Sequence, residues 1–173
     1  SIDRATAMLP KLYMERLDEA GIDFGICYGT QALGVLRVGD DELRPVVYRA
    51  MNTMYADMFK GLEYRLTPAA VIPMHKPEEA IAEMEFVKKQ LGLKTIVMNT
   101  QIQVPHPKVV EEAPHLAGFS MAPTSPAIDQ GDKYDPVWAK CVELGLAPTC
   151  HNSSRGRGTL NGSPTNYVYN SLG

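Results

Sequence analysis

The feature of this sequence that most constrains its fold is a repeated alternation between short apolar runs and helical patterns. Each apolar run has the length of a β-strand and follows a segment in which apolar residues recur every three or four positions. Strands that are apolar throughout are typical of parallel sheets covered by helices, because both faces are then buried. A doubly wound sheet and a (β/α)8 barrel both fit this order. The expected strands are 22–28, 69–74, 94–99 and 146–151, and the expected helices are 5–20, 42–62, 77–91 and 135–144.

Two connecting segments are predicted to lack regular structure. Residues 30–41 are expected to form a loop. Residues 100–133 contain five prolines and little periodicity, which predicts a long excursion between a strand and a helix. The helix that follows is expected to be capped by Asp135, to carry Pro136 in its first turn and to end at Gly145.

Composition narrows the function classes. A chain of 173 residues with 45% hydrophobic residues and a net charge of −3 has the make-up of a globular domain. No run of 18 apolar residues is found, so we expect no membrane span. No secretory signal is found in the given residues, and processing before Ser1 stays open. Three cysteines without metal-binding spacing predict reduced thiols and a cytoplasmic setting. A pI near 5.8 gives no footprint for nucleic acid.

Candidate functional residues are those that follow the expected strands, because active sites of parallel α/β folds lie at the carboxyl ends of their strands. Tyr28, His75, Asn99 and His151 meet this test. His151 is the strongest candidate, since it ends an apolar strand and precedes a polar, glycine-rich loop. A single histidine in such a place is nevertheless more often a hydrogen-bonded structural residue than a ligand.

Two arginines lie in the glycine- and serine-rich loop at 152–165. Arg155 and Arg157 could bind a carboxylate or phosphate through paired hydrogen bonds, although a solvated loop explains them equally well. The glycines match neither a dinucleotide-binding fingerprint nor a phosphate-binding loop. His106 and His115 are expected to be solvated, and no residue is assigned a catalytic role. Methionines at helical spacing are expected to fill the core; these are Met51, Met54 and Met58.

Metal binding is weakly indicated by spacing alone. A catalytic metal of the zinc type needs about three protein ligands and an open position. The four histidines are scattered along the chain and form neither an H-x-H nor an H-x-x-E-H motif.

Six segments occur in the order in which similar segments occur in a known family. The chain resembles the amidohydrolase family 2 branch of TIM-barrel proteins, which includes aminocarboxymuconate-semialdehyde and resorcylate decarboxylases. The similarity extends over about residues 10–173. It is carried by VIPM (71–74), PEEA (77–80), LGLK (91–94), YDPVW (134–138), ELGLAPTCH (143–151) and SPTNYVYN (163–170).

The resemblance implies a metal-dependent hydrolase or non-oxidative decarboxylase on a (β/α)8 barrel, acting on a small carboxylated substrate. In such proteins a histidine at the end of the fifth strand binds a divalent ion, and His151 matches that position. The implied ion is zinc, with manganese as an alternative. The substrate would be bound by Arg155, Arg157, Asn99 and His75.

The chain departs from the family pattern in ways that set the expected domain organisation. It contains no H-x-H motif, lacks the late aspartate ligand, and has Ser171 where relatives often have histidine. A whole barrel takes about 250 residues. Residues 1–173 are therefore expected to form one partial barrel domain with about strands two to five of a longer protein. The oligomeric state is left undecided, with a homodimer as one option. The alternative is a non-catalytic α/β fragment or binding module without a complete metal site.

Overall fold

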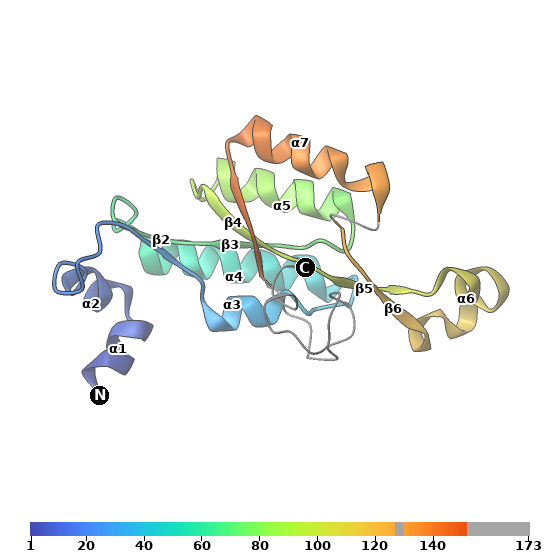
Figure 1. The fold of residues 1–173 in the computed structure, drawn as a ribbon, viewed down its shortest axis with the longest axis horizontal. Helices are drawn as coiled ribbons and strands as arrows, with labels where there is room; N and C mark the ends of the chain where they lie inside the picture. Colours follow the sequence, from blue (N-terminus) through green and yellow to red (C-terminus); the bar gives the residue numbers. More distant parts are fainter. Residues whose placement is uncertain (127–129, 152–173) are drawn as a thin grey trace, which may run out of the picture.

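The structure is a computed structural model that describes residues 1–126 and 130–151, and its centre is a set of parallel strands (Figure 1). β1 pairs with β2, β3 with β4, and β4 with β7, and all three pairings are parallel. Ala69 alone separates β2 from β3, so one extended stretch pairs first with β1 and then with β4. The strands thus lie in chain order, and all four predicted strands are confirmed. Their bounds are β1 Gly25–Cys27, β2 Leu66–Pro68, β3 Ala70–Ile72, β4 Thr95–Asn99 and β7 Ala147–His151.

Each connection between neighbouring strands contains a helix. α4 (Leu43–Phe59) joins β1 to β2, α5 (Pro77–Lys89) joins β3 to β4, and α7 (Asp135–Leu144) precedes β7. Figure 1 shows α5 and α7 side by side on one side of the strands, and α3 (Thr30–Val35) and α4 on the other. These helix-containing connections are what parallel neighbours require.

The helix ends follow from local chemistry. α5 begins with Pro77, which has no amide hydrogen to lose, and carries acidic residues in its first turn and lysines in its last, both favourable to the helix dipole. α7 ends at Gly145, whose φ of 58° is left-handed and therefore suits glycine. The expected cap is corrected: Asp135 is the first helical residue, and Tyr134 holds the cap position without a side-chain hydrogen bond.

Strands β3 and β4 are buried on both faces, because successive side chains of a strand point to opposite sides. Ala70 and Ile72, with their partners Ile96 and Met98, belong to a core cluster with residues of α5 and α7. Val71 and its partner Val97 belong to a second cluster with residues of α3 and α4. The continuous apolar pattern is thereby explained. β7 is different, since four of its five residues are exposed.

The N-terminal segment corrects two expectations. The single helix expected at 5–20 is divided into α1 (Ile2–Met8) and α2 (Pro10–Glu15), because a residue before proline is driven out of helical conformation and Leu9 is extended. The loop expected at 30–41 begins with the short helix α3. No helix in the described ranges is both long and apolar enough to cross a membrane.

The proline-rich excursion contains regular structure. β5 (Ile102–Pro105) and β6 (Met121–Thr124) pair in antiparallel fashion, with the helices α6 (Pro107–Glu112) and η1 (Pro114–Phe119) between them. Figure 1 shows this arm projecting away from the parallel strands. A further short helix, η2 (Gly131–Tyr134), precedes α7. His106 and His115, both on the arm, are exposed as expected.

Candidate active site at the carboxyl ends of the strands

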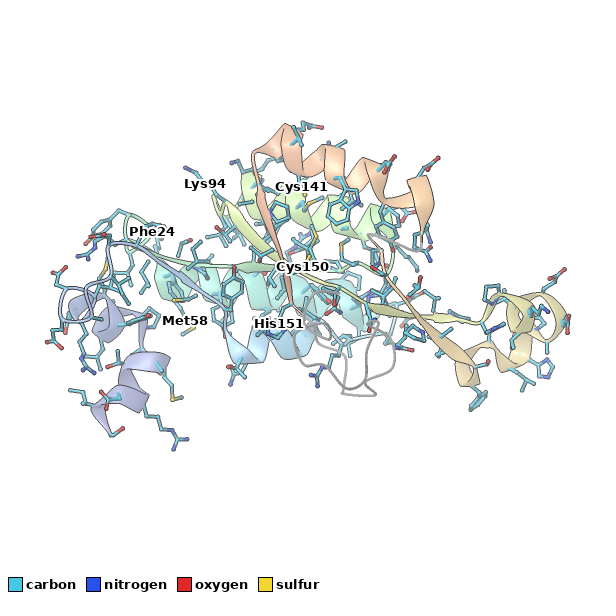
Figure 2. All side chains as sticks on the ribbon, viewed as in Figure 1. Phe24, Met58, Lys94, Cys141, Cys150 and His151 are labelled. Carbon is cyan, nitrogen blue, oxygen red and sulfur yellow. The ribbon has the colours of Figure 1, made fainter. Side chains whose placement is uncertain are left out.

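The carboxyl ends of β4 and β7 bring two predicted site residues together. Asn99 is the last residue of β4, His151 is the last residue of β7, and the two are register partners. Neighbouring strands lie about 4.8 Å apart and paired residues share a face, so these side chains are neighbours. They lie on the side of Val97 and Thr149, opposite α5 and α7. In Figure 2, His151 lies at the far end of β7, next to Cys150 in the chain.

His151 and Asn99 have different environments. His151 is exposed, so its imidazole can accept a ligand without a rearrangement of the core. Asn99 is 6% exposed, and its side-chain Nδ2 donates a hydrogen bond to the backbone carbonyl of Leu36. Leu36 is the C-cap residue of α3. The amide of Asn99 therefore links the end of β4 to the segment that follows α3.

His75 lies just beyond β3, at the same end of the sheet. Its ring is partly buried, and Nδ1 has no hydrogen-bond partner in the described part of the chain. Burial, together with the positive charge of Arg44, lowers the pKa of His75 from 6.5 to about 4. The imidazole is therefore neutral near pH 7.

The loop that carries His75 is attached to the start of the α7 region. The hydroxyl of Tyr134 donates to the carbonyl of Met74 at 2.6 Å and makes a longer contact of 3.4 Å with the carbonyl of His75. Tyr134 is completely buried, and burial raises the pKa of its phenol to about 12. This hydroxyl thus remains a hydrogen-bond donor across the physiological pH range.

Two buried polar atoms without a hydrogen-bond partner among the described residues lie at this end of the strands. Besides His75 Nδ1, the buried Oγ1 of Thr100 has no partner among the described residues, and Thr100 directly follows β4. Buried polar groups are almost always hydrogen-bonded, so such atoms mark places where a water molecule or a ligand group can bind.

An ion-pair network centred on the buried Arg44 lies beside these groups, and sequence reasoning missed it. Arg44, only 1% exposed, donates to both carboxylate oxygens of Glu79 at 2.6 and 2.9 Å and to Asp41 at 2.6 Å. Lys76 donates to the second Asp41 oxygen at 2.7 Å. The sequence shows only the helical spacing of Arg44, Tyr48 and Asn52 at i, i+4 and i+8, and the structure shows that this series on α4 is buried.

The described residues do not form a metal centre by themselves. Within 1–126 and 130–151, no three side chains of histidine, cysteine, aspartate or glutamate gather closely enough to hold an ion. Of the residues predicted to form the site, His151 alone offers an exposed imidazole at a strand end. Arg155 and Arg157 lie outside the described residues, so their predicted roles stay predictions.

Comparison with known proteins identifies the fold. No protein-family model and no curated protein matches the sequence. Among solved structures, 2,6-dihydroxybenzoate decarboxylase from Rhizobium matches 80% of this chain with a TM-score of 0.61 and 19% identity. Dihydroxybenzoic acid decarboxylase from Polaromonas sp. JS666, with bound manganese and the inhibitor 2-nitroresorcinol, matches 84% with a TM-score of 0.63 and 23% identity. 5-Carboxyvanillate decarboxylase from Novosphingobium aromaticivorans, with bound manganese, matches 80% with a TM-score of 0.55 and 20% identity.

These similarities define the architecture as part of a TIM barrel. The matched structures are decarboxylases that share 19–23% identity with this chain, and they confirm the fold that the sequence motifs led us to expect. The chain spans between 33% and 39% of the length of the three relatives. Parallel strands in chain order with helical connections are what a segment of such a barrel shows.

Proposed function

We propose that the chain is part of a metal-dependent, non-oxidative decarboxylase that acts on a small carboxylated substrate. The observation that carries the proposal is the position of His151, an exposed imidazole at the carboxyl end of a parallel strand in a fold similar to known decarboxylases. In that reaction the bond between carbon and the carboxylate breaks, carbon dioxide leaves, and a proton is added at the carbon.

Decarboxylation is favoured over hydrolysis by the identity of the structural relatives. The three compared structures are decarboxylases of hydroxylated or methoxylated aromatic acids. An aromatic acid of that kind is the substrate class we propose. The residues proposed to contact it are Asn99, His75, Arg155 and Arg157, with the arginines meeting the carboxylate.

The chain is proposed to provide one domain, residues 1–173, that corresponds to about strands two to five of a complete barrel. β1, the β2–β3 stretch, β4 and β7 would be those four strands. His151 would then stand at the end of the fifth, where one metal ligand is expected from the sequence resemblance. The protein is proposed to act in the cytoplasm.

A divalent ion, manganese or zinc, fits this chain only if other parts of the complete protein supply some of its ligands. No three potential ligands gather among the described residues, and His151 is the one ligand we propose from them, so the remaining ligands would come from other parts of the complete protein. Such an ion, when bound, polarises a carboxylate or acidifies a bound water molecule. The contribution proposed for this chain is to hold His151 at a fixed strand end beside Asn99.

The test uses the full-length protein with His151→Ala, and His106→Ala as the matched control, because both histidines are exposed and only His151 ends a parallel strand. Bound manganese and zinc are measured by mass spectrometry, and carbon dioxide release is measured with 2,6-dihydroxybenzoate and 5-carboxyvanillate. We expect His151→Ala to lose metal and activity while His106→Ala keeps both. Unchanged metal in a folded His151→Ala protein would remove the assignment, and a metal-free, inactive wild type would favour the non-catalytic alternative.

A further inference from the structure

We infer that residues 36–42, which connect α3 to α4, form a fixed wall of the proposed active site. Asn99, Arg44 and Glu79 are the positioning residues that hold this wall. The inference rests on the proposed function, since the wall borders the site that contains His151. It goes further in two ways. It assigns Asn99 a positioning role at the site, and it assigns the same role to the ion pair of Arg44 and Glu79, which are 35 residues apart in sequence.

The first end of the wall is bonded to the strand that neighbours His151. Leu36 is completely buried, and its carbonyl accepts the hydrogen bond from Asn99 Nδ2. Asn99 is in turn the register partner of His151. A displacement of Leu36 therefore acts on the residue beside the proposed metal ligand.

The second end of the wall is connected through Arg44 to Glu79 in the first turn of α5. Arg44 donates through Nη1 to the carbonyl of Gly39 at 2.8 Å and through Nη2 to Asp41 at 2.6 Å, both within the wall. The same guanidinium donates twice to Glu79, which follows β3 on α5. Lys76 adds a bond to Asp41 from the end of the β3 loop.

These bonds make the wall dependent on one buried charge. A guanidinium that donates to a carboxylate through two parallel bonds has a fixed orientation, which an ammonium cannot reproduce. Removing the Glu79 charge leaves the guanidinium buried without its main partner, which is strongly unfavourable. The least disruptive response is for residues 36–42 to detach, because most of them are already exposed to solvent; the exposed ones are Arg37 and Gly39 to Glu42.

The wall contains a built-in reporter of detachment. Trypsin cleaves after arginine and lysine but not before proline, so Arg37–Val38 is cleavable and Arg44–Pro45 is not. Proteolysis by this route follows the population of the open form. In the full-length protein we expect Glu79→Gln and Asn99→Asp to speed cleavage after Arg37 by about tenfold or more. Cleavage after the exposed Lys94, outside the wall, serves as the internal reference.

Matched variants separate local detachment from general unfolding. Glu143→Gln removes an exposed ion pair with Lys140 on α7, away from the wall, and is expected to leave cleavage unchanged. Arg44→Lys keeps the positive charge but not the paired bonds, and is expected to behave like Glu79→Gln. Two results would overturn the anchoring. One is that the variants speed cleavage after Arg37 and after Lys94 equally. The other is that neither Glu79→Gln nor Asn99→Asp speeds cleavage after Arg37.

The catalytic arm measures KM and kcat for 2,6-dihydroxybenzoate together with bound metal. A positioning role predicts that Glu79→Gln raises KM several-fold more than it lowers kcat, with metal content unchanged. An unchanged KM in a protein whose wall has detached would overturn the role of the wall in the site. If the wild-type full-length protein releases no carbon dioxide, the proposed function fails, and the cleavage pattern still decides whether the wall is anchored.

Discussion

The side chain of Asn52 on α4 replaces a neighbouring strand for Val71 on β3. Its Nδ2 donates to the Val71 carbonyl at 2.9 Å, and its Oδ1 accepts from the Val71 amide at 2.8 Å. β1 has ended at Cys27, so no strand among the described residues pairs with this edge of β3. Both backbone groups are buried and would otherwise lack partners.

Asn52→Ala is therefore expected to be among the more damaging single substitutions in the chain. It leaves a buried amide and a buried carbonyl unpaired and also removes a bond to the buried Glu83. The expected loss in the free energy of unfolding is about 2–4 kcal/mol, measured by urea denaturation of the full-length protein. Thr53→Ala removes an exposed hydroxyl bonded within the same helix and serves as control. Equal stability of the two variants would contradict the strand-replacement role.

Gly29→Ala tests a close approach between the end of β1 and α4. A Cβ atom at Gly29 would lie 2.1 Å from the hydroxyl oxygen of Tyr55 and 2.4 Å from the ring carbon that bears it. We expect a loss of about 1–3 kcal/mol of stability from this overlap. Adding Tyr55→Ala to Gly29→Ala should abolish that cost, which a double-mutant cycle measures.

The control for this substitution lies five residues away. A Cβ at Gly34 would meet nothing within 4 Å, and Gly34 lies within α3. Because alanine is the better helix former, Gly34→Ala should stabilise the protein by about 0.5–1 kcal/mol. A Gly29→Ala protein as stable as Gly34→Ala would show that Tyr55 does not occupy the position described.

His75 gives a prediction about pH. Burial and the Arg44 charge lower its pKa to about 4, below the value of 6.5 of an unfolded chain. The unfolded state therefore binds more protons between these two values, so this residue's contribution to stability is complete above pH 6.5 and is lost as the pH falls toward 4. The imidazole carbon resonances should titrate with a midpoint near 4, and His75→Gln should flatten the stability profile between pH 4 and 6.5. A midpoint near 6.5 would contradict the buried placement.

The strands were predictable because their signal is local. A continuous apolar run between a glycine and a polar loop specifies a strand that is buried on both faces, and the interior of β4 satisfies this at every position. Gly145 marks the end of α7 by its left-handed backbone. The place of Asn99 and His151 at strand ends follows from the same runs.

α4 shows why the rest could not be read in the same way. The expectation that Met54 and Met58 fill the core is wrong, since they are 41% and 40% exposed. The buried stripe of this helix begins instead with Arg44, Tyr48 and Asn52, whose burial depends on distant partners. A pattern of hydrophobicity does not contain the information that Glu79 will meet Arg44. Val142 on α7 is apolar and yet exposed, because α7 packs against its neighbours along a stripe that contains Val137 and Cys141.

The change of partner at Ala69 has a geometric consequence for the shape of the sheet. The last residue of β1, Cys27, is level with Pro68, whereas Met98, next to the end of β4, is level with Ile72. These levels differ by about 13 Å along the strand, at about 3.3 Å per residue. The strand ends therefore rise in steps from β1 to β4, and a sheet sheared in this way inclines its strands to a common axis, as closure into a cylinder requires.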